Sequence, residues 1–95
     1  MSRRESAEER EANAFARAHG VKKYKLNGQG DRGKPDAMYL FNGKAIFIEF
    51  KQRGKKPTAL QLRELAALSD LGFFVGWTDD AEVAKKWIAE QLLTR

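Results

Sequence analysis

The dipeptide Asn42-Gly43 constrains this chain more than any other feature, because it separates two runs of apolar residues. Asn-Gly in that setting is the strongest short-range signal for a β-hairpin, closed by a type I′ turn. We therefore predict strands over residues 36–41 and 44–51. A two-residue turn pairs Phe41 with Lys44. A four-residue loop would keep this pairing, whereas a three-residue loop would break it.

The predicted register brings two carboxylates together. Counting back from the turn, Met38 faces Phe47 and Asp36 faces Glu49, with Cβ atoms about 5 Å apart. Lys51 follows on the same face, because side chains alternate along a strand. Opposed carboxylates repel each other, and burial requires that a proton or a cation neutralise them.

Both faces of the hairpin are largely apolar, with Ile46, Ile48 and Phe50 on the face opposite the carboxylates. We therefore expect an interior hairpin whose charges lie at the end of a covered sheet. The alternative is an edge hairpin on which the three charged side chains are only solvated.

Capping and periodicity signals predict the remaining elements. These are a helix over residues 4–19, a strand over 21–26, a helix from Thr58 to Gly72, a strand over 73–77 and a last helix after Asp79 or Asp80. The first helix has two possible starts, because Ser2 with Glu5 and Ser6 with Glu9 each fit a capping box. The glycine-rich segment 27–35 indicates a loop.

The order α-β-β-β-α-β-α predicts an α/β fold, with a mixed sheet flanked by helices on both faces and a single domain over residues 1–95. The nearly continuous apolar run 73–77 is typical of an interior strand. The predicted buried faces of the last two helices are Leu62, Leu65, Leu68 and Leu71, and Val83, Trp87, Ile88 and Leu92.

The residue inventory limits the possible chemistry. The chain has no cysteine and one histidine, which excludes disulfides, thiolate zinc sites and cysteine nucleophiles. Carboxylates and lysines must then carry any reaction, and oxygen ligands favour Mg²⁺ or Mn²⁺. No apolar run reaches transmembrane length, so we expect a cytoplasmic protein with no membrane partner.

Positive charge is concentrated in one part of the chain. The formal net charge is +5. Between residues 44 and 63, Glu49 is the one acidic residue, and the basic residues are Lys44, Lys51, Arg53, Lys55, Lys56 and Arg63. This excess favours a polyanionic partner, most plausibly nucleic acid, as strongly as it favours a merely solvated surface.

A metal beside Lys51 and a basic loop suits phosphodiester hydrolysis. The metal would activate water, and Lys51 could orient that water or neutralise the transition state. The loop Arg53–Lys56 would hold neighbouring phosphates. The alternatives are a non-catalytic nucleic-acid-binding module and a nuclease with another DNA or RNA substrate.

Pro35-Asp36 followed by Glu49-Phe50-Lys51 resembles the PD-(D/E)XK nuclease superfamily. The segments "RESAEE", "GDRGKPD" and "FIEFKQRGKKPTALQ" resemble more closely the VRR-NUC (virus-type replication-repair nuclease) domain, and the likeness covers nearly the whole chain. The resemblance implies a restriction-endonuclease-like αβββαβ core and Mg²⁺- or Mn²⁺-dependent cleavage. It further implies a stand-alone, phage-type homodimer that cuts branched DNA, such as four-way (Holliday) junctions, in the host cytoplasm.

The family's site residues match positions in this chain. Asp36 and Glu49 match the metal-ligand carboxylates, Lys51 the catalytic lysine, and the Phe50 carbonyl a further ligand. Gln61 matches the glutamine that opens the following helix, although it is equally well explained as the capping partner of Thr58.

Two glutamates compete for the role of the first-helix ligand. Glu5 and Glu9 each fit, and each also has a capping interpretation. We favour Glu9 slightly, because Glu5 lies where the helix can fray. The residues expected to bind nucleic acid are Lys34, Arg53, Lys55 and Lys56.

Overall fold

The computed structural model describes residues 5–26 and 33–94. The predicted capping role of Ser2 and most of the predicted loop 27–35 lie outside the described residues. The elements follow the chain as α1 (Ala7–Ala18), β1 (Lys22–Lys25), β2 (Ala37–Phe41), β3 (Lys44–Phe50), α2 (Ala59–Asp70), β4 (Phe74–Thr78) and α3 (Ala81–Ile88), which continues into a π-helical turn, η1 (Ala89–Leu93). The predicted element order is confirmed.

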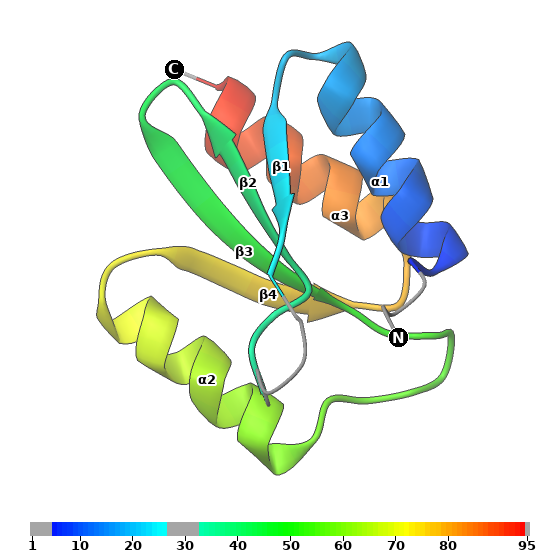
Figure 1. Ribbon diagram of the computed structural model, residues 1–95, viewed down its shortest axis with the longest axis vertical. Coiled ribbons are helices and arrows are strands. Elements are labelled where there is room, and N and C mark those ends of the chain that lie inside the picture. Colours follow the sequence, from blue (N-terminus) through cyan, green and yellow to red (C-terminus); the bar gives the residue numbers. More distant parts are fainter. Residues whose placement is uncertain (1–4, 27–32, 95) are drawn as a thin grey trace.

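The four strands form one mixed sheet in the order β1-β2-β3-β4. β1, β2 and β3 pair antiparallel, whereas β4 runs parallel to β3 after the α2 crossover. Helices α1 and α3 pack against each other on one face of the sheet, and α2 lies against β4 on the other (Figure 1). This architecture is the predicted α/β fold with helices on both faces.

The hairpin between β2 and β3 has the predicted turn and register. Asn42 and Gly43 both take positive φ angles, 52° and 78°, as a type I′ turn requires. Phe41 pairs with Lys44 and Met38 with Phe47. The regular pairing ends at Ala37 and Ile48, one residue before Asp36 and Glu49.

Capping decides where α1 begins and ends. The Ser6 side chain accepts a hydrogen bond from the Glu9 backbone N–H at 3.0 Å, so the helix starts at the second of the two predicted sites. At the other end, Gly20 takes a φ of 76° and Val21 N–H donates to the carbonyl of Ala16. Together these contacts form a Schellman motif, which terminates the helix. The ends of α1 therefore set the position of Glu9 relative to the sheet.

The main core lies between the sheet and the α1–α3 pair. Ile46, Ile48 and Phe50 from β3 pack there with small α1 residues such as Ala12 and Ala16. Ile88 and Leu92 are buried in the same core, as predicted, whereas Val83 and Trp87 are half-buried. The small α1 side chains let this helix lie close to the strands that carry the site.

Two predictions about α2 and β4 are wrong. Leu65 is buried, but Leu62 is 47% exposed and Leu71 is 73% exposed, so the four leucines do not form one buried face. β4 is an edge strand of the described sheet and is mostly half-buried, not interior. Residues of β4 are apolar because α2 packs on one face of this strand and the Trp87 ring packs on the other. The apolar run does not indicate how many strands flank β4.

The close approach of α3 to β4 depends on Gly76. A Cβ atom at this position would lie 2.8 Å from two carbons of the Trp87 ring. We expect Gly76→Ala to lower the free energy of unfolding by about 1–3 kcal/mol, because the ring must shift out of a packed contact. Urea unfolding measures this loss. The cost should shrink in a Trp87→Phe background, and an equal cost in both backgrounds would contradict the steric explanation.

Candidate active site

Asp36 and Glu49 lie at one end of the β2–β3 hairpin and are both buried, at 2% and 0% exposure. The Asp36 Oδ2 atom accepts a hydrogen bond from the Phe50 backbone N–H at 2.8 Å. Asp36 therefore closes the hairpin just beyond the last regular pair through its side chain. This contact also orients the backbone from which the Phe50 carbonyl projects.

Glu49 is held by two neighbouring side chains. Its Oε2 atom accepts a hydrogen bond from Gln61 Nε2 at 2.9 Å and lies 3.3 Å from the Lys51 Nζ atom. The Lys51 backbone N–H donates to the carbonyl of Thr78, which extends the β3–β4 pairing by one residue. Lys51 is thus anchored by its backbone while its ammonium group stays beside Glu49.

Gln61 caps α2 and also contacts a buried carboxylate. It forms the capping box of α2, because its Oε1 atom accepts from Thr58 N–H and its own N–H donates to Thr58 Oγ1. The remaining amide nitrogen of the side chain donates to Glu49. The start of α2 therefore positions a group that restrains a buried carboxylate.

Glu5 and Glu9 differ in position, burial and partners: Glu9 lies in the first turn of α1, whereas Glu5 precedes the Ser6 cap and lies outside the helix predicted to contain it. The Glu9 side chain is 3% exposed, and both of its oxygens accept hydrogen bonds from Lys25 Nζ at 3.0 Å. The Glu5 side chain is 35% exposed and accepts from Lys23 Nζ at 2.7 Å. This hydrogen bond from Lys23 holds the pKa of the Glu5 carboxyl below its ordinary value.

Lys23 and Lys25 were not foreseen as site residues. Lys23 also lies 3.3 Å from Glu9, so two lysines of β1 surround one buried carboxylate of α1. The signal was present in the segment Lys22-Lys23-Tyr24-Lys25, because strand alternation places Lys23 and Lys25 on one face. What the pattern could not indicate is that α1 covers this face.

A buried polar link, also missed, connects α1 to β2. The Tyr39 hydroxyl donates to Asn13 Oδ1 at 2.6 Å, and Asn13 Nδ2 donates to Glu5 Oε2 at 3.1 Å. Burial, together with the negative charge of Glu9, raises the pKa of Tyr39 above its ordinary value. Tyr39 therefore remains a neutral hydrogen-bond donor that fixes α1 beside the carboxylates.

A cleft of about 600 Å³ opens between the start of α1 and the end of the hairpin. The predicted site residues that line it are Glu5, Glu9, Asp36, Phe50, Lys51 and Lys55. Glu49 is not among the lining residues; it is fully buried and contacts Lys51, which does line the cleft. The cleft thus brings together residues from α1, the hairpin and the loop after it.

The donor set at this place fits a hard divalent cation. Asp36, Glu49 and the Phe50 carbonyl offer oxygen atoms at one end of the sheet, and Mg²⁺ and Mn²⁺ prefer such ligands. Over residues 5–26 and 33–94, however, no three His, Cys, Asp or Glu side chains are grouped closely enough to hold a metal ion. The oxygens of Glu9 contact lysines here, so they do not complete such a group.

The predicted nucleic-acid-binding residues are exposed but do not lie together. Lys55 lines the cleft, whereas Arg53 lies in a shallow pocket beside the start of α3. Gly54, with a φ of 85°, donates its N–H to Asp79 Oδ2 and so attaches this loop to the end of β4. Lys34 and Lys56 are also exposed. Lys55 thus shares the cleft with Asp36 and Glu9.

No helix formed by residues 5–26 and 33–94 is long and apolar enough to cross a bilayer.

Known proteins resemble this chain in sequence and in fold. The chain is 42% identical over 82 residues to a protein named "Putative nuclease p44" from Acyrthosiphon pisum secondary endosymbiont phage 1, covering 85% of this chain and 88% of that protein. A solved structure described as a VRR_NUC domain superposes with a TM-score of 0.67 at 27% identity, covering 87% of this chain and 96% of the other. No protein-family model matches the chain.

Proposed function

The chain belongs to the VRR-NUC family of nucleases, and from this premise we propose that it is a Mg²⁺- or Mn²⁺-dependent endonuclease that cuts branched DNA, such as four-way (Holliday) junctions. One observation carries the proposal: two buried carboxylates, Asp36 and Glu49, share the end of a hairpin with Lys51, whose Nζ atom lies 3.3 Å from Glu49. Buried carboxylates at such a place are costly for stability and suit a cation site.

Asp36, Glu49 and the Phe50 carbonyl would hold the metal. Glu9 is the better candidate for a further ligand from α1, because it is buried and lines the same cleft as Asp36, whereas Glu5 is more exposed. A bound Mg²⁺ or Mn²⁺ lowers the pKa of coordinated water and stabilises charge on a phosphodiester.

Neighbouring hydrogen-bond donors orient the proposed metal ligands. Gln61 restrains the Oε2 atom of Glu49, and the Phe50 N–H restrains Asp36. Lys51 is half-buried on the cleft wall, where its positive charge can stabilise a phosphate oxygen of the substrate. A partly dehydrated cleft strengthens this attraction relative to water.

Symmetric cleavage of a junction requires two active sites. One site of this kind cuts one strand, so symmetric cleavage of a junction calls for a two-fold dimer. Exposed apolar side chains on α2 and just after it, including Leu62, Leu71 and Phe73, support self-association. We place this homodimer in the cytoplasm of the phage's host.

The second candidate function is a nucleic-acid-binding module without catalysis. The ion pairs between Glu9 and the two lysines favour it, because they occupy a carboxylate that the catalytic proposal would use.

Cleavage of end-labelled DNA distinguishes the two functions. We expect the protein to cut a four-way junction with Mg²⁺ or Mn²⁺ and not with EDTA, and to cut a linear duplex of the same sequence more slowly. If the protein binds the junction but does not cut it with either metal, the result contradicts the enzyme and supports the binding module. Equal rates of cutting on junction and duplex would contradict the proposed preference for branched DNA. A monomeric mass in solution would contradict the proposed dimer.

A further inference from the structure

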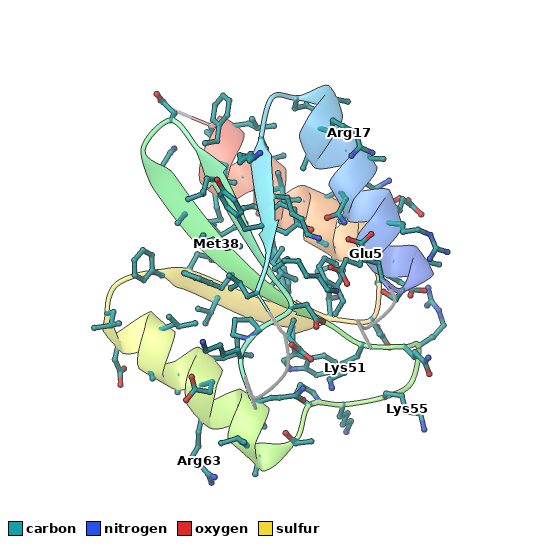
Figure 2. All side chains as sticks on the ribbon, viewed as in Figure 1. Glu5, Arg17, Met38, Lys51, Lys55 and Arg63 are labelled. Atoms are coloured by element: carbon teal, nitrogen blue, oxygen red, sulfur yellow. The ribbon has the colours of Figure 1, made fainter. Side chains whose placement is uncertain are left out.

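A second cleft, of about 470 Å³, lies between α1 and the start of β1. Its charged lining residues are Glu5, Arg10, Arg17, Lys22 and Lys23. Four of these five are cationic, although this part of the chain lies outside the basic segment 44–63. Figure 2 shows Glu5 between Arg17, toward the end of α1, and Lys51 at the active-site cleft.

Of the four cations in this second cleft, Lys23 is the one that forms salt bridges within residues 5–26 and 33–94. Lys23 neutralises Glu5 across 2.7 Å. The Arg10 guanidinium donates to the backbone carbonyl of Glu5, which uses a hydrogen bond but cancels no charge. Lys22 Nζ lies 5.3 Å from the centroid of the Tyr24 ring. In the part of the chain that the structure describes, no carboxylate forms a salt bridge with Arg10, Arg17 or Lys22.

The second cleft adjoins the active-site cleft, because Glu5 and Arg10 line both of them. Lys51 and Lys55 line the active-site cleft, and Arg17 and Lys22 line the second one, so cations lie on both sides of this shared wall. A row of separated cations suits a polymer with regularly spaced negative charges better than it suits a small anion.

We infer that Arg10, Arg17 and Lys22 form a second contact surface for the DNA sugar-phosphate backbone, on the α1 side of the cleavage site and away from loop 53–56. This inference rests on the proposed function, because it assumes that DNA is the substrate in the neighbouring cleft. Such contacts add affinity and fix the path of the strand without reading its sequence.

The salt dependence of binding tests this surface. The variant Arg17→Ala/Lys22→Ala changes two exposed side chains and leaves the buried carboxylates in place. Binding to a labelled four-way junction is measured by fluorescence anisotropy in EDTA, so that no cleavage occurs. We expect the affinity to fall about tenfold at moderate salt, and the slope of log K against log salt to become shallower by about two, one for each lost phosphate contact.

Two further variants separate position from total charge. Lys86→Glu lowers the net charge by the same amount at one exposed site on α3, outside the basic segment, and should bind almost as the parent does. Arg17→Lys/Lys22→Arg should restore most of the affinity. The inference is overturned if Arg17→Ala/Lys22→Ala binds like the parent, or if the Lys86 control loses as much. If the parent itself binds no DNA, the proposed function fails and this surface fails with it.

Discussion

Glu49→Gln is expected to reduce metal-dependent cleavage by at least about 10³-fold while the protein stays folded. The amide keeps the size of the carboxylate but removes the negative charge that would hold the cation. Glu49 is fully buried and accepts a hydrogen bond from Gln61, so no neighbouring carboxylate can take its place without moving the start of α2. Single-turnover cleavage of a labelled junction measures the loss.

Matched controls tie this loss to the site. Glu90→Gln makes the same chemical change at an exposed position and should leave the rate unchanged. Lys51→Met should also abolish cleavage, because it removes the ammonium group 3.3 Å from Glu49. A folded Glu49→Gln protein, verified by its thermal unfolding, that cuts at the parent rate would place the chemistry elsewhere.

Lys25→Met is expected to lower the free energy of unfolding by about 2 kcal/mol. Glu9 is 2% exposed, and Lys25 donates to both of its oxygens. Removing the lysine leaves a buried carboxylate with less compensation, although Lys23 remains 3.3 Å away. Urea unfolding at neutral pH measures the change.

A double-mutant cycle isolates this pair. In a Glu9→Gln background, Lys25→Met should cost much less, since no charge is left to compensate. Lys85→Met is the comparison with an exposed carboxylate: Lys85 lies 2.7 Å from Glu11, whose side chain is 53% exposed, so water screens that charge and we expect no comparable loss. An equal cost of Lys25→Met with and without the Glu9 charge would show that the lysine acts only through its packing.

The hairpin was the most predictable part of the molecule. Asn-Gly specifies a turn that only a few backbone conformations satisfy, so the pairing of Met38 with Phe47 followed from counting residues. The same counting placed Asp36 and Glu49 at one end of the sheet. It could not predict that the Asp36 side chain accepts a hydrogen bond from the Phe50 N–H, because that contact depends on where the regular pairing ends.

Edge and interior positions were less predictable. An apolar run such as Phe74–Val75 indicates that a strand is shielded from water, and either a neighbouring strand or a packed helix can provide this shielding. The chain places α2 and the Trp87 ring over β4, so its pattern resembles that of a central strand. Metal choice, junction preference and dimer formation stay predictions, each with its own measurement.

The sequence by itself determined the Asn-Gly turn, the capping box of α2 and the register of the β2–β3 hairpin, because these depend on interactions between residues close together in the chain. Only the tertiary structure decided which partners the buried charges have. Lys25 reaches Glu9 across 16 residues, and Gln61 reaches Glu49 across 12. Such contacts arise from the packing of α1 and α2 on the sheet. A local sequence pattern does not indicate which distant side chain will contact a given buried charge. The hairpin sequence therefore specifies where Asp36 and Glu49 lie, whereas the groups that α1 and α2 add to the site depend on how these helices pack.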